Sequence, residues 1–257
     1  MNRLFHLAAI VGLLTIGVFA QDPLKVAPQN YKLEFENDWV KVVRVHYGAR
    51  EKIVAHDHTQ TAAAYVYLND SGPVIFKHIN LSYGAITRPE TKAGSFRLYK
   101  AVKEVHEVEN PGDTPSDFLR VEFKTAPVNE KSLHGKYHRE AYPAGENFKK
   151  TQFENEQIRV SRVVAAPGKK IDVSTNSTEP ALLIALSAAK FKLSARNGKA
   201  SQLNLELGRA RWVGINQPEA LENSGDAPAE LLRFDFKTKP VRSESNEKGK
   251  PHVHPHN

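Results

Sequence analysis

The chain has 257 residues, with no cysteine and a single methionine. The absence of cysteine excludes disulfide bonds, thiolate metal ligands and a lipid-modified N-terminal cysteine, so an exported form must be held together by its core alone. Arginine and aromatic residues form no joint cluster, which argues against a nucleic-acid-binding surface. Hydrophobic residues make up 40% and charged residues 25% of the chain, as in an ordinary soluble globular protein.

The sequence also lacks a hydrophobic run long enough to span a membrane. An apolar stretch from about Leu7 has about 14 such residues, whereas a spanning helix needs about 20. Arg3 precedes this stretch, and Val18-Phe19-Ala20 ends it with small residues at the positions that signal peptidase reads. We therefore predict a signal peptide over residues 1–20, a mature chain starting at Gln21, a secreted or periplasmic location, and no stable membrane insertion after cleavage.

Positive charge is in excess but is spread along the chain. The formal net charge of +7 falls to +6 when Arg3 leaves with the predicted signal peptide. We interpret this excess as solubility with some preference for anionic small molecules, and not as nucleic-acid binding. The expected partner is thus a small-molecule ligand, with an anionic one favoured, and a homodimer is left open.

The sequence contains two copies of one unit. YKLEFENDWVKVVRV, which starts at Tyr31, returns as KKTQFENEQIRVSRV, and VENPGDTPSDFLRVEFKT returns as LENSGDAPAELLRFDFKT. The offsets are 118 residues for the first pair and 113 for the second, so five residues are lost in the second copy. Two homologous halves follow. The predicted segments after the signal peptide are a first half over 21–127, a linker over 128–146, a second half over 147–240 and a disordered tail over 241–257.

Both halves have the pattern of β-structure. Short β-branched or aromatic runs alternate with turn signals such as Asn69-Asp70-Ser71-Gly72. Many short strands at regular spacing, without helical periodicity, predict an all-β sandwich or jelly-roll barrel. In the first half the expected strands are 40–47, 64–68, 74–79, 96–102 and 118–123.

Three histidines of the first half form a candidate metal site. His56 and His58 stand two residues apart, so on a strand both side chains project to one face. His106 lies fifty residues further on, just before the turn at Asn110, where an antiparallel strand could bring it beside the other two. Three imidazoles suit a divalent transition metal such as Fe, Mn, Zn, Cu or Ni, with positions left for water, oxygen or substrate.

These residues resemble the cupin family, whose motifs are G-x5-H-x-H-x3-4-E-x6-G and G-x5-P-x-G-x2-H-x3-N. The sequence looks like a bicupin over about residues 31–238. The positions that fit in the first half are Gly48, His56, His58, Gly94, His106 and Asn110. The resemblance implies two tandem cupin-type jelly-roll barrels, also called double-stranded β-helices, with His56, His58 and His106 as metal ligands.

The first half departs from the cupin pattern at several positions. The spacing from Gly48 to His56 is two residues too long, and the proline and glycine of the second motif are missing. The second glycine of the fit also lies one residue too far from its histidine. Ala62 or Ala63 stands where the glutamate ligand belongs. The site is therefore expected to be a reduced one with three histidines.

The second half departs further. From Gly168 the motif count reaches Ser174 and Asn176 in place of histidines, and from Gly208 it reaches Glu219. Hydroxyl and amide groups are poor ligands for a transition metal. This degenerate copy is expected to hold no such metal and to serve as a structural partner or a metal-free pocket.

The loss of the glutamate has a chemical consequence. Three neutral imidazoles leave a divalent ion its full charge, which makes it a stronger Lewis acid and a better anchor for an anionic substrate. By resemblance, three-histidine cupins include iron dioxygenases that cleave diketones or oxidise thiols. Two functions are thus nearly level: a metal-dependent dioxygenase of a small organic acid or diketone, and a non-catalytic binder of a small ligand or metal. A structural module for protein contacts is a third alternative. The sequence identifies no catalytic residue.

Other histidines and acidic residues have weaker claims as ligands. His46 and His78 lie on expected strands and are interpreted as surface residues or neighbours of the site. Glu104 and Glu107 flank His106 and offer a carboxylate, but neither is preferred by register, and a solvated strand face is the alternative.

Two further histidine pairs or runs lie outside the expected strands. His134 and His138 would pair on a helix, which the intervening Gly135 disfavours. The tail run, an H-x-H-x-H pattern on a flexible chain, can bind zinc, copper or nickel weakly. Its members are His252, His254 and His256.

Overall fold

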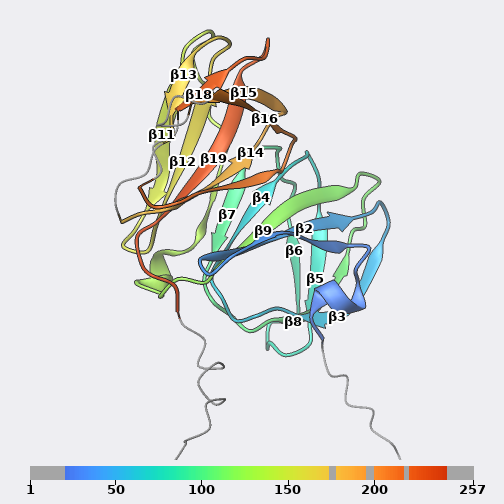
Figure 1. Ribbon diagram of the computed structural model, residues 1–257. Helices are drawn as coiled ribbons and strands as arrows, with labels where there is room; N and C mark the ends of the chain where they lie inside the picture. Colours follow the sequence, from blue (N-terminus) through green and yellow to red (C-terminus); the bar gives the residue numbers. More distant parts are fainter. Residues whose placement is uncertain (1–20, 174–177, 195–199, 217–219, 242–257) are drawn as a thin grey trace, which may run out of the picture.

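The computed structural model describes residues 21–173, 178–194, 200–216 and 220–241. The predicted signal peptide and the three tail histidines lie outside these residues. Within them, nearly all regular structure is β-strand, and the prediction of an all-β fold is confirmed. Figure 1 shows the two halves packed on one another, the first coloured blue to green and the second yellow to red.

Two antiparallel sheets build the first half. The larger sheet has the strand order β1 (Tyr31–Glu36), β2 (Val40–Tyr47), β9 (Ser116–Phe123), β4 (Ala63–Tyr67), β7 (Phe96–Tyr99) and β10 (Gly135–Tyr137). The smaller sheet has the order β3 (Lys52–Asp57), β8 (Val105–Glu109), β5 (Val74–His78) and β6 (Ala85–Arg88). One short helix, α1 (Pro23–Val26), packs against β1 and β3.

The second half repeats this arrangement. Its larger sheet has the order β11 (Phe148–Glu154), β12 (Ile158–Ala165), β19 (Ala229–Phe236), β14 (Ala181–Ala185) and β17 (Ala210–Val213). Its smaller sheet has the order β13 (Lys170–Asp172), β18 (Ala220–Asn223), β15 (Ala189–Ser194) and β16 (Ala200–Leu205). The two halves therefore share one topology, as the internal repeat predicts.

Local irregularities repeat as well. The pairing of β1 with β2 shifts register between Leu33 and Phe35, and that of β11 with β12 shifts between Thr151 and Phe153. Such a bulge bends a strand and increases its twist. The two shifts occupy equivalent positions of the repeat, so the two copies bend at the same point.

The predicted linker over 128–146 contains ordered structure. It holds a 3-10 turn, η1 (Glu130–Ser132), and strand β10, which pairs antiparallel with β7. This segment thus extends the larger sheet of the first half. The boundaries at 127, 146 and 240 stay predictions.

The central strands face two cores at once. Along β9, Phe118 points into the interior of the first half, whereas Leu119 and Phe123 point outward to the second half. Strands β4 and β14 are buried along their whole length. A strand buried on both faces carries a continuous apolar run in place of an alternating one. That is why AAYVY and ALLIA show no polar residue at every second position.

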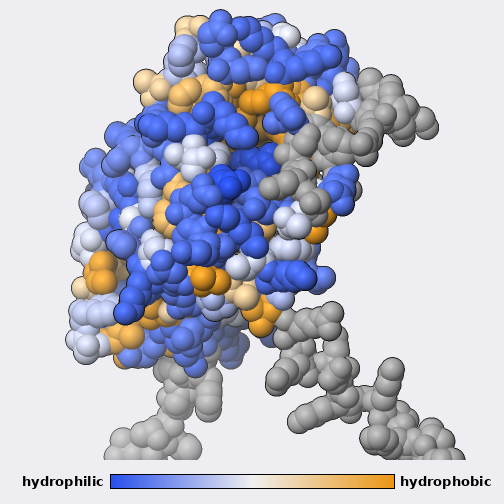
Figure 2. All heavy atoms as spheres, turned by 90° about the vertical axis from the view of Figure 1, so that its left-hand side faces the viewer, coloured by the Kyte–Doolittle hydropathy of each residue, from blue (hydrophilic) through white to orange (hydrophobic). Residues whose placement is uncertain are grey.

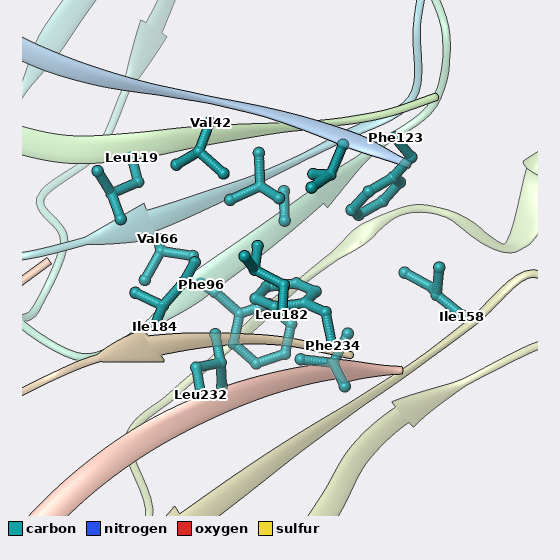
Figure 3. Packing of buried hydrophobic residues seen from close by; sticks show 14 of the residues in the cluster. Val42, Val66, Phe96, Leu119, Phe123, Ile158, Leu182, Ile184, Leu232 and Phe234 are labelled. Atoms are coloured by element: carbon teal, nitrogen blue, oxygen red, sulfur yellow. The ribbon is translucent and has the colours of Figure 1, made fainter. Parts of the chain in front are cut away.

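A shared hydrophobic core joins the two halves. Figure 3 shows side chains of the first half, among them Val66 and Phe96, pointing toward Leu182 and Phe234 of the second half. Burying each such side chain contributes about 1.5–3 kcal/mol. Other members of this shared core are Val42, Leu119, Phe123, Ile158, Ile184 and Leu232. The outer faces of the two larger sheets therefore form one hydrophobic layer.

A buried ion-pair cluster lies at the margin of the shared core. Arg162 on β12 is fully buried and contacts Glu230 on β19 through its guanidinium group. The same guanidinium donates to the backbone carbonyl of Gly94 in the first half, and Arg139 pairs with the second oxygen of Glu230. This cluster links four segments of the chain by charge-assisted hydrogen bonds.

The face drawn in Figure 2 is mainly hydrophilic, with hydrophobic residues in small separate groups. This pattern agrees with charge that is spread along the sequence. Among the described residues, no helix has the length and hydrophobicity that crossing a membrane would require.

Candidate metal centre

A row of histidines crosses the smaller sheet of the first half. His56 on β3 lies opposite His106 on β8, and His106 lies opposite His78 on β5. Residues directly opposite one another on antiparallel strands project to the same face of the sheet. His58 follows His56 by two residues and shares this face. All four imidazoles are buried.

The structure brings the three predicted ligands together. The ring centroids of His56 and His58 are 4.9 Å apart, those of His56 and His106 4.8 Å, and those of His58 and His106 5.1 Å. One ring nitrogen from each lies within 4.8 Å of the others. This geometry can hold one metal ion.

The protonation state of the cluster suits a cation. Burial lowers the pKa of His56, and it lowers the pKa values of His58 and His106 well below the ordinary value of histidine. Repulsion from Arg120 lowers these pKa values further. The imidazoles are therefore neutral near pH 7, and each keeps a lone pair that a metal can accept.

Hydrogen bonds fix the orientation of His56. Its Nδ1–H donates to the carbonyl oxygen of Val54 over 2.8 Å, so its Nε2 carries the lone pair. Histidines that bind metals typically donate their other ring N–H to such an acceptor. The Tyr31 hydroxyl lies 2.8 Å from this Nε2 and 2.8 Å from the Tyr47 hydroxyl. A bound ion at Nε2 would therefore lie beside the Tyr31 hydroxyl.

Among the residues that the structure describes, neither ring nitrogen of His106 has a hydrogen-bond partner, although both are buried. An unpaired buried polar atom is costly, since it loses its hydration and gains nothing in return. A cation in the cluster would satisfy one of these nitrogens. The residues present thus fit a resident metal ion.

The carboxylate of Glu104 also lies beside the histidine cluster, at a sequence position other than that of the glutamate in the cupin motif. Glu104 is buried, with one carboxylate oxygen 3.9 Å from His106 Nδ1 and the other 3.6 Å from His78 Nε2. Glu107 is exposed, because it lies an odd number of residues from His106 and faces outward. The sequence interpretation that register favours neither residue was therefore wrong. His78, which could have been a surface residue, is buried beside the site.

A cavity of about 70 Å³ adjoins His58. Its lining includes Tyr31 and Lys41, and α1 contributes to its mouth. Arg120 on β9 also lines it, and this buried guanidinium donates to Glu122 and to the Tyr65 hydroxyl. Arg120 and Glu122 were not predicted from the sequence as residues of the site. Their spacing from Phe118 was the available signal, because residues two and four apart on one strand share a face.

The remaining candidates lie away from the cluster. His46 is exposed and contacts Asp117 over 2.7 Å. His134 and His138 are both exposed, and His134 lies against the carbonyl oxygen of Lys131. None of these three histidines belongs to a group of potential metal ligands in the part of the chain that the structure describes.

The described interior of the second half holds a hydrophobic cluster, with the buried pair Arg233 and Asp235 on β19. Positions 174, 176 and 219, which correspond to the three histidines, lie outside the described residues. Among the described residues of this half, Ile171, Val173, Phe191 and Leu221 belong to one apolar cluster. Among the described residues, the groups that could hold a metal all lie in the first half. The expectation that the second half holds no transition metal stays a prediction.

Asn110 and Asn223 serve the same structural purpose in the two halves. The side-chain amide of Asn110 donates to the carbonyl oxygens of Gly48 and Thr114, and that of Asn223 donates to those of Ala165 and Ala227. Both side-chain oxygens accept the backbone N–H two residues later. The asparagine that fits the cupin motif thus fastens a turn.

No protein-family model matches the sequence, and no curated protein matches it. The structure is similar to solved structures at 10–13% identity, so the likeness concerns the fold alone. Salicylate 1,2-dioxygenase from Pseudoaminobacter salicylatoxidans, in a structure with gentisate, has a TM-score of 0.53 at 12% identity, covering 78% of this chain and 69% of that one.

Two further structures match over a larger share of their own length. The cupin 2 conserved barrel domain protein from Leptotrichia buccalis has a TM-score of 0.50 at 12% identity, covering 80% of this chain and 88% of that one. AerE from Microcystis aeruginosa has a TM-score of 0.52 at 10% identity, covering 80% of this chain and 97% of that one.

Proposed function

Because the chain has the cupin fold in two tandem copies, as its motifs indicate, we propose that it is a metal-dependent dioxygenase of a small organic acid or diketone. Its metal ligands are His56, His58 and His106. The observation that carries the proposal is the convergence of three buried, neutral imidazoles on one point. An iron(II) ion held there would supply Lewis-acid and redox chemistry.

An anionic substrate would be held by the bound metal ion and not by the charge of the cavity wall. Lys41 and Arg120 line the cavity next to His58, but the acidic residues Asp22, Asp57 and Glu122 line it as well. In the fold neighbour, the bound molecule is gentisate, a carboxylate. Burial raises the pKa of Tyr31 well above its ordinary value, so its hydroxyl keeps its proton and can donate to a ligand at the site.

Oxygen uptake tests this function. The mature chain, with His252, His254 and His256 replaced by alanine, is loaded anaerobically with iron(II) and mixed with salicylate, gentisate or diketones. We expect uptake with at least one substrate and its loss in His56→Ala, because that change removes one of three ligands. His46→Ala, an exposed histidine away from the site, is the matched control. Uptake that is indifferent to His56→Ala would contradict the proposal.

The alternative function is a non-catalytic binder of a small ligand or metal. The size of the cavity favours binding of a metal ion without an organic substrate, because about 70 Å³ is well below the 300–1,000 Å³ of pockets that hold organic ligands. Thermal-shift measurements over the same compounds separate the two functions. A binder is stabilised by its ligand and never turns it over.

We further propose export to the periplasm or the medium, from the charge and apolar pattern of residues 1–20. N-terminal sequencing of chain recovered from either compartment is expected to begin at Gln21. Full-length chain retained in the cytoplasm would refute export. The homodimer that the sequence left open stays open.

A further inference from the structure

We propose that His78, Glu104 and His106 form a second divalent-cation site, which shares His106 with the three-histidine site. One ligand atom from each of the three side chains lies within 4.8 Å of the others, and all three residues are buried. The set offers two imidazoles and one carboxylate, which together suit zinc, cobalt or iron. This second site goes beyond the proposed function, which uses only the three histidines.

Lone pairs face one another across this group. The Nδ1–H of His78 donates to the carbonyl oxygen of Gly84 over 3.1 Å, so its Nε2 carries a lone pair. That lone pair is directed at a carboxylate oxygen of Glu104, 3.6 Å away. Within the described ranges of the chain, both atoms are buried without a hydrogen-bond partner, as are both ring nitrogens of His106. A positive charge placed between these atoms turns a repulsive arrangement into an attractive one.

Separations within the group equal or slightly exceed those of ligands around one ion. Ligands bound tetrahedrally at about 2.0–2.2 Å lie roughly 3.3–3.6 Å from one another. Glu104 has one oxygen 3.6 Å from His78 Nε2 and the other 3.9 Å from His106 Nδ1. Both distances are too long for hydrogen bonds, and small side-chain rotations bring them to coordination distance.

Neighbouring side chains leave the negative charge of Glu104 available to a cation bound at this site. In the part of the chain that the structure describes, no lysine or arginine lies within ion-pair distance of its carboxylate, and only the two histidines do. A buried carboxylate needs a partner of opposite charge, and a metal ion is one.

The position of His106 in the smaller sheet of the first half explains how it contributes a ligand to both sites. It lies on β8 between β3 and β5, with His56 opposite on one side and His78 opposite on the other. One ring nitrogen, Nδ1, is the nitrogen near Glu104. If both sites fill together, the imidazole gives its ring proton to solvent, since each nitrogen then binds one cation.

Cobalt(II) binding in a disabled first site tests the proposal. The protein is the mature chain with its three tail histidines changed to alanine, carrying His56→Ala and His58→Ala. We expect it to keep one cobalt per chain by plasma mass spectrometry, with a visible cobalt absorption band. Adding Glu104→Gln is expected to weaken this binding at least 100-fold, whereas Glu107→Gln, on the outward face of β8, leaves it unchanged.

Three outcomes would overturn the second site. One is a folded His56→Ala, His58→Ala chain, with a cooperative thermal transition, that binds no cobalt. Another is cobalt that stays bound after both Glu104→Gln and His78→Ala are added. The third is loss of metal from the three-histidine site when Glu104→Gln alone is made, which would make Glu104 a ligand of a single centre. Because oxygen uptake plays no part, failure here leaves the proposed function standing.

Discussion

His106→Ala is expected to remove all metal from the body of the protein, with affinity lowered by at least roughly 100-fold. Losing a group that only orients a ligand already costs 10–100-fold in affinity, and loss of a ligand costs more. His106 belongs to both groups of potential ligands, so this one change affects every candidate site among the described residues. The measurement is metal stoichiometry by plasma mass spectrometry, with the tail histidines replaced by alanine.

The metal-free fold is expected to tolerate this change. Among the described residues, neither ring nitrogen of His106 has a hydrogen-bond partner, so the substitution breaks no polar contact of the side chain. It does remove the packing of the imidazole against Phe76 and leaves a cavity. Metal-free His106→Ala should therefore still unfold in one cooperative transition, with a lowered thermal midpoint, and His46→Ala should keep its metal. Metal retained at full stoichiometry in folded His106→Ala would refute the role of this cluster.

Glu230→Ala is expected to lower the free energy of unfolding by about 3–5 kcal/mol. The carboxylate pairs with Arg162 and Arg139, and Arg162 is fully buried. Without Glu230, the guanidinium of Arg162 stays buried and has no carboxylate within ion-pair distance among the described residues. Breaking a buried pair from one side costs this much because it leaves an uncompensated charge.

Urea denaturation of the metal-free chain measures this effect. Asp113→Ala is the matched control, because Asp113 pairs with Arg50 on the surface, where its side chain is 83% exposed. Surface pairs contribute about 0–1 kcal/mol. A Glu230→Ala chain as stable as the Asp113→Ala chain would show that the buried cluster adds nothing to stability.

Much of the fold could be predicted from the sequence because the same pattern of strands and turns occurs in both halves. Phe35-Glu36-Asn37 and Phe153-Glu154-Asn155 mark the same turn, after β1 and after β11. The two-residue period of a strand placed His56 and His58 on one face, and the motif added His106. The boundaries of strands were close as well, since the expected strand over 40–47 is β2 and that over 118–123 falls within β9.

The rest of the site depends on register, which a sequence does not display. His78 meets His106 only because β5 pairs with β8 at that residue, and His56 reaches its place after a register shift that follows Ile53. Tyr31 comes from a strand of the other sheet. Glu104 is different, because parity along the chain already separated it from Glu107.

The shared core between the halves also makes the assembly independent of concentration. Two separate copies meeting through such a surface would part on dilution, since association between molecules carries a translational cost. Here the partner is attached through residues 128–146, and a short linker keeps the effective concentration on the order of millimolar or above. The second half therefore stays packed on the first at any protein concentration. Substitutions that remove metal ligands from the interior of the second half leave this packing intact, provided that its outer face still covers the first half.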